Sequence, residues 1–209
     1  MKPEDEPYAL SSLAEQQRRI ALLNQPHIAP LAKYLADIKA EHPEKDLPCF
    51  DPCDGGVGAR VLFLLEAPGP KAVGSTFISR NNPDPTARNM CDLFQEAGIS
   101  RSDTVIWNIV PWYVGDGERI RAVNDDDIRQ SLPYVEGLLS LLPHLKVIAL
   151  VGKKAQSAKS QIRQLTSLPI IDTPYPSATN FNTRPHQKDE MRELLRQIAA
   201  ITNGNGVVA

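Results

Sequence analysis

The sequence has little of what marks several common classes of protein. Its three cysteines are an odd number and predict no disulfide framework. No run approaches the ~18 consecutive apolar residues of a membrane-spanning helix, and no charged-then-apolar signal peptide opens the chain. The net charge of −2 is not basic, so any contact with nucleic acid must come from a local patch. We therefore expect a cytoplasmic protein, in a bacterial cytoplasm or nucleoid, that makes no membrane contact.

Metal-ligand patterns are also sparse. Cys49 and Cys53 are separated by three residues, and Cys91 is the only other thiol. A four-ligand zinc or iron–sulfur site would have to recruit a further ligand, such as one of the four histidines. We expect no metal and no cofactor, with such a recruited site as the alternative.

Apolar runs and proline are what the sequence does have. The 18 prolines in 209 residues are roughly 9% of the chain, against about 5% on average, which predicts long structured loops. Apolar runs without polar alternation predict buried strands at 61–65, 105–107, 147–151 and 169–171. Helical periodicity lies between these strands. The repeated strand–helix order predicts a three-layer α/β/α fold around a central, mainly parallel four-stranded sheet.

The chain has no linker that would divide it. We expect residues 1–209 to form a single domain, with the N-terminal helices within residues 1–45 packed on it. Apolar residues at i, i+3, i+4 and i+7 from Leu31 to Ile38 predict the firmer of these helices. Residues 203–209 are expected to form a frayed tail.

The junction after the first predicted strand is the centre of the predicted site. Glu66 follows the apolar run 61–65 at once, and Ala67-Pro68-Gly69-Pro70 cannot extend a strand. Ligands of open α/β sheets bind at the carboxyl ends of strands, which makes Glu66 a candidate catalytic residue. The alternative is that Glu66 caps the next helix.

Four further residues are candidates for this site. Asn108 ends the second predicted strand, and its amide, which both donates and accepts, can read the edge of a base. Phe77 can stack on that base. Asp84 precedes Pro85, a pattern typical of a helix N-cap, and we favour capping over catalysis there. Lys153 lies at a predicted helix start, where it is a phosphate candidate or simply a solvated lysine.

After the fourth predicted strand comes Tyr175-Pro176-Ser177-Ala178. This stretch, the junction at 65–69, Phe77 and Asn108 together resemble the uracil-DNA glycosylase superfamily in order and spacing, over roughly residues 48–202. Leu65-Glu66-Ala67-Pro68-Gly69 is similar to its first motif, which reads Gly-Glu-Ala-Pro-Gly in some branches. Tyr175-Pro176-Ser177-Ala178 resembles the second motif, usually His-Pro-Ser-Pro. Leu65 replaces a common glycine and Tyr175 replaces the histidine. Branches with the Gly-Glu-Ala-Pro-Gly motif often carry four cluster cysteines, and three thiols argue that the cluster is absent.

The resemblance implies an enzyme that hydrolyses the N-glycosidic bond of flipped-out deoxyuridine in single- or double-stranded DNA. Its products would be free uracil and an abasic site. Glu66 would stabilise the cationic sugar and orient the attacking water, while Phe77 would stack on uracil and Asn108 would read its edge. Tyr175 or His186 would do the work of the missing histidine. The further contacts implied are main-chain N–H groups around Ala67 and Gly69 for uracil, and Ser177, Asn180 and Arg184 for DNA.

Two other functions stay open on sequence alone. The replacement of histidine by Tyr175 suggests a non-catalytic superfamily member that binds uracil-containing or abasic DNA. A nucleotide-binding α/β hydrolase acting on a small molecule is a third interpretation, and the poor glycine-rich loops speak against it. In each case we expect a monomer.

Overall fold

The computed structural model describes residues 6–115 and 121–204. Most of the predicted frayed tail, residues 205–209, lies outside the described residues. In the described part of the chain, no helix is long and apolar enough to cross a membrane.

A four-stranded parallel sheet forms the centre of the fold. Its strands are β2 (Val61–Leu65), β4 (Thr104–Asn108), β5 (Val147–Val151) and β6 (Ile170–Thr173), in the order β4-β2-β5-β6. The residues of β2, β4 and β5 are buried almost throughout, as apolar strands covered on both faces should be. The predicted sheet is confirmed, and the four strands lie at the predicted positions.

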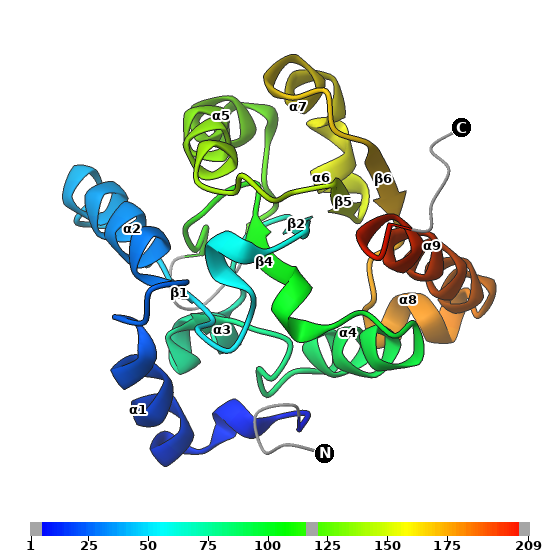
Figure 1. Cartoon of the computed structure of the whole chain (residues 1–209), viewed down its shortest axis with the longest axis horizontal. Coiled ribbons are helices and arrows are strands. Elements are labelled where there is room, and N and C mark those ends of the chain that lie inside the picture. The colour runs from blue at the N-terminus through cyan, green and yellow to red at the C-terminus, as the bar shows by residue number, and fades with distance from the viewer. Residues whose placement is uncertain (1–5, 116–120, 205–209) are drawn as a thin grey trace.

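Helices cover both faces of this sheet. On one side lie α5 (Asp125–Ser140), α6 (Lys153–Ser157) and α7 (Lys159–Leu165), and on the other lie α4 (Pro85–Glu96), α8 (Ala178–Thr183) and α9 (His186–Thr202) (Figure 1). The N-terminal helices α1 (Leu13–Leu22) and α2 (Ala29–Glu41) lie beyond the β4 edge of the sheet (Figure 1). Buried residues of α2 and α9 belong to the same core cluster as the strands.

Three details differ from the sequence-based expectation. A two-residue parallel pair, β1 (Cys49–Phe50) with β3 (Phe77–Ile78), lies beside β4 and was not predicted. The helix predicted after β5 is broken at Ala158 into α6 and α7. Two stretches predicted as loops each contain a short helix, α3 (Pro70–Ser75) and α8, because Pro70 and the Ser177 cap favour helix starts.

A buried ionic cluster joins α1 to the segment that follows β3. Arg19 is completely buried and contacts Asp51, Ser79 (3.3 Å) and Asn81 (3.1 Å). Arg101 lies 2.7 Å from Asp51. Burial opposes ionisation of Asp51, but Arg101 and Arg19 hold the pKa of that carboxyl below its usual range. This ionic cluster therefore fixes the chain at residues 79–81. The residues that follow reach the end of the sheet where its strands have their carboxyl ends.

The pKa of a second aspartate in the cluster is shifted in the opposite direction. Asp54 lies 3.0 Å from the Nε of Arg101 and 3.7 Å from Arg80. Burial raises the pKa of Asp54 to about 6, with Arg101 and Arg80 opposing the rise and the charge of Asp51 adding to it. The folded chain therefore binds a proton at Asp54 more tightly than the unfolded chain does.

Candidate active site

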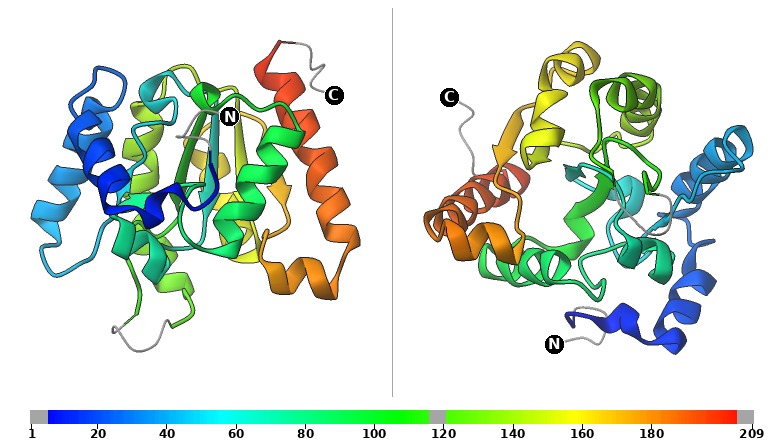
Figure 2. Two further views of the ribbon diagram at one scale, coloured as in Figure 1. Left: turned by 90° about the horizontal axis from the view of Figure 1, so that it is seen from below. Right: turned by 180° about the vertical axis from the view of Figure 1, so that it is seen from behind.

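Two neighbouring cavities open at the carboxyl ends of the sheet strands. This is the end at which α3 and α8 lie, since they follow β2 and β6 (Figure 2). The smaller cavity has a volume of about 310 Å³, and residues 67–72, Asn82, Asp84 and Asn108 line it. The larger has a volume of about 590 Å³. The predicted junction after β2 therefore borders both cavities, with residues 67–72 on one side and Glu66 on the other.

The larger cavity holds most of the charged candidates. It is lined by Glu66, Lys153, Lys154, Ser177, Asn180 and Arg184, among others. Lys153 and Arg184 are exposed at its rim. Ser177 caps α8 by accepting from the Asn180 backbone N–H at 3.1 Å, so it has a structural task as well as a place in this cavity.

Asn108 ends β4 and faces the smaller cavity. Leu65 of β2 is its partner in the sheet register, so the segment after Leu65 runs alongside Asn108. The Asn108 side chain is 3% exposed, and its Nδ2 has no hydrogen-bond partner among the described residues. A buried amide donor without a partner costs about 1–3 kcal/mol, so Asn108 is suited to a ligand that accepts from it.

Glu66 lines the larger cavity and does not cap the helix that follows it. Its Oε1 accepts a hydrogen bond from the Val123 backbone N–H at 3.2 Å. The next helix, α3, begins after Gly69 without a side-chain cap. The alternative that Glu66 caps this helix therefore finds no support in the structure.

Tyr175 lines both cavities. Thr86, at the start of α4, lines the smaller cavity together with Tyr175. Burial raises the pKa of Tyr175, and the nearby carboxylates of Asp84 and Glu66 raise it further. The phenol therefore stays protonated at neutral pH and can donate a hydrogen bond.

Two predicted site residues lie elsewhere. Phe77 is completely buried in β3, paired with Cys49, and lines neither cavity. A ring with no exposed face cannot stack on a base in this conformation, and Ile78 lines the smaller cavity instead. His186 is exposed at the first residue of α9 and also lines neither cavity, so Tyr175 is the better placed of the two candidates for the missing histidine.

Asp84 has the structural role that its sequence context predicts. Its Oδ1 accepts from the Ala87 backbone N–H at 2.9 Å and caps α4. The residue also lines the smaller cavity, beside Thr86 and Asn82. No local pattern had singled out Thr86 or Asn82, because their places in the site depend on how α4 packs.

The cysteines make no recognisable metal site. None of the three forms a disulfide bond, and Cys53 accepts a contact from Arg18 at 3.6 Å. Across residues 6–115 and 121–204, no group of three His, Cys, Asp or Glu side chains is placed to hold a metal ion.

Comparisons with known proteins were made against families, curated sequences and solved structures. The family model of the Uracil DNA glycosylase superfamily matches residues 52–199. No curated protein matches the chain. Among solved structures, the chain is similar to the NMR structure of a "putative Uracil DNA glycosylase" from Methanosarcina acetivorans. That protein is 15% identical, with a TM-score of 0.47, over 68% of this chain and 92% of the other.

Proposed function

The chain belongs to the Uracil DNA glycosylase superfamily, and we propose that it excises uracil from DNA. The reaction is hydrolysis of the N-glycosidic bond of deoxyuridine, which gives free uracil and an abasic site. The observation that carries this proposal is the buried Asn108 amide, whose Nδ2 lacks a partner and faces a cavity next to the first motif. Superfamily membership supports a glycosylase role in general, and the choice of uracil rests on Asn108.

The smaller cavity is suited to receive a base that has left the stack. Flipping a nucleotide out of a duplex costs about a few kcal/mol, which contacts in the pocket must offset. The Asn108 Nδ2 can donate to uracil O4, which is an acceptor, whereas cytosine carries an amino donor at that position. The chain around Ala67 and Gly69 lines the same cavity, so its main-chain N–H groups are candidates to support the leaving uracil.

The sugar then lies where the two cavities meet. With the base beside Asn108 in the smaller cavity, the sugar would reach the larger cavity beside Tyr175, which lines both, and Glu66 lines the larger one. As this bond lengthens, the sugar becomes cationic and the base anionic. Glu66 can stabilise the cation and orient water, and the protonated Tyr175 hydroxyl can donate to the anionic base. DNA phosphates would follow the larger cavity, where Lys153 and Arg184 are exposed.

Uracil release is the direct test. The purified protein should release uracil from single- or double-stranded oligonucleotides that contain it, without added metal. Asn108→Asp should lower this release by about 10- to 100-fold, because the loss of one buried donor costs about 1–3 kcal/mol. A carboxylate accepts from the cytosine amino group, so discrimination against cytosine should also relax.

The control for this variant is Asn203→Asp, at the far end of α9, which makes the same chemical change outside both cavities. No uracil release by the wild-type protein on either substrate would overturn the proposal. Tight binding to abasic DNA without turnover would instead favour a non-catalytic DNA-binding member, the function that Tyr175 in place of histidine suggests.

Gly152 offers a separate test of the position of Tyr175. Gly152 has φ 83°, and a Cβ added there would lie 2.9 Å from the Tyr175 Cβ. Gly152→Ala should therefore displace Tyr175 and slow uracil release by about 10-fold or more. Backbone strain should separately lower the stability of this variant by roughly 1–2 kcal/mol. Gly98→Ala is the matched control, since Gly98 has φ 69° with nothing within 4 Å of an added Cβ. Equal activity of the two variants at equal stability would contradict a role for the Tyr175 position.

A further inference from the structure

The segment that carries Tyr175 has few backbone donors of its own. Pro174 and Pro176 flank Tyr175 and have no N–H group. Their carbonyls and those of their neighbours still need donors where they are buried. The segment follows β6 and precedes α8, so its hydrogen bonds decide where the Tyr175 ring lies.

Side-chain amides from three different helices supply donors to this segment. Gln156 of α6 donates to the Thr173 carbonyl at 2.8 Å. Asn180 of α8 donates to the Tyr175 carbonyl at 2.9 Å. Asn89 of α4 donates to the Pro176 carbonyl at 2.8 Å. These three amides, which we call the amide clamp, come from both sides of the sheet and meet on one stretch of four residues.

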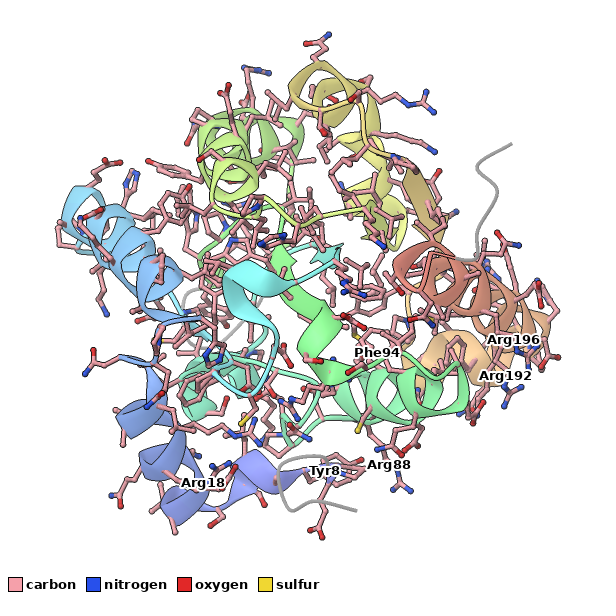
Figure 3. The ribbon with its side chains drawn as sticks, viewed as in Figure 1. Tyr8, Arg18, Arg88, Phe94, Arg192 and Arg196 are labelled. Carbon is pink, nitrogen blue, oxygen red and sulfur yellow. The ribbon has the colours of Figure 1, made fainter. Side chains whose placement is uncertain are left out.

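Helix α4 is a fixed support for its part of the clamp. Near its start, the Arg88 guanidinium lies 5.8 Å from the centre of the Tyr8 ring, and the two side chains are neighbours in Figure 3. At its last residue, Glu96 forms a 2.7 Å ion pair with Arg192 of α9. Thr86 of α4 also lines the smaller cavity with Tyr175, so the same helix lies against the backbone of this segment and borders the cavity that the Tyr175 ring lines.

We propose that Asn89, Gln156 and Asn180 are positioning residues that set Tyr175 between Glu66 and the smaller cavity. This inference rests on the proposed glycosylase function for its activity readout. None of the three amides needs to touch the reacting atoms, since each acts on the backbone that carries Tyr175. Misplacement of a catalytic group by about 1 Å can lower a rate by about 100-fold.

Asn89→Asp tests the clamp with almost no change in shape. At pH 8 the aspartate cannot donate, and its charge faces the Pro176 carbonyl. The kcat of uracil release should fall by about 10-fold or more, with a smaller change in KM for DNA. The ordinary pKa of aspartate is about 3.9, so the carboxyl gains a proton and regains a donor as the pH falls toward 4, and activity relative to the wild type at the same pH should recover. Asn89→Leu, which has no donor at any pH, should not recover.

Two further measurements separate positioning from general structure. In a Tyr175→Ala background, Asn89→Asp should have little further effect on kcat, because the side chain that the clamp positions is gone. Asn182→Asp, on an exposed face of α8, is the matched control and should keep wild-type activity. The proposal would be overturned if the activity of Asn89→Asp relative to the wild type did not change with pH. It would also be overturned if the losses in kcat were additive in the double variant.

Hydrogen–deuterium exchange keeps the clamp testable without catalysis. The Ser177 backbone N–H donates to the Tyr175 carbonyl at 3.0 Å, so its exchange reports on this segment. Asn89→Asp should speed exchange in residues 170–182 at pH 8 but not elsewhere in the sheet. If the wild-type protein releases no uracil while this exchange still rises, the proposed function fails and the clamp stands. Unchanged exchange would overturn the clamp, whatever the activity.

Discussion

Glu66→Gln should lower the rate of uracil release by about 100- to 10,000-fold, the range that positioned acid–base and charge-stabilising groups supply. Glutamine keeps the shape of the side chain and can still accept from the Val123 N–H, which is 3.2 Å from Glu66 Oε1. It loses the negative charge that stabilises a cationic sugar. Single-turnover kinetics on a uracil-containing oligonucleotide would measure the loss in the chemical step.

Binding and folding should be unaffected by this change. We expect the affinity of Glu66→Gln for the same oligonucleotide to stay within a few-fold of the wild type. Glu136→Gln on α5, an exposed carboxylate outside both cavities, is the control for loss of one negative charge. If Glu66→Gln kept full activity, Asp84 would become the better candidate, since it also lines the smaller cavity.

Arg19→Met should lower the free energy of unfolding by about 3–5 kcal/mol, because it leaves the buried Asp51 carboxylate with fewer partners. Arg19 is completely buried and bonded to Asp51, Ser79 and Asn81. Urea unfolding followed by the fluorescence of the buried Trp107 and Trp112 would measure this loss.

The neighbouring Arg18 provides a control for the ionic cluster. It is exposed and pairs with Glu15 at 2.7 Å, so Arg18→Met should cost no more than about 1 kcal/mol. Because the pKa of Asp51 is lowered in the folded state, the stabilisation it provides is present above about pH 4 and is lost as the pH falls. The difference between the wild type and Arg19→Met should therefore shrink in acid. A loss under 1 kcal/mol at pH 7 would contradict the role given to Arg19.

The sheet could be predicted because its signals are local. Unbroken apolar runs mark buried strands, and polar residues directly after them mark the edge where ligands bind. That reasoning placed Glu66, Asn108 and Tyr175 near one another, and the structure brings them to two adjoining cavities. The first motif and its strand were accessible to prediction for the same reason.

The parts that could not be predicted depend on partners far away in the chain. Phe77 was expected to face the base, but its pairing with Cys49 in β3 buries the ring. Arg19 pairs with Glu15 four residues earlier, but its partners Asp51 and Asn81 lie 32 and 62 residues away. Asn89 lies on a helix whose apolar face was clear, yet nothing in the local pattern links it to Pro176.

The strand order also constrains how the site can form during folding. Val61 of β2 pairs with Thr104 of β4 on one side and with Val147 of β5 on the other. Such parallel pairings between distant segments close large loops, which makes folding slow. During synthesis, β2 cannot gain its second neighbour until more than two thirds of the chain has been made. Nascent chains would thus expose β2, with Glu66 beside it, well before the loop that carries Tyr175 exists.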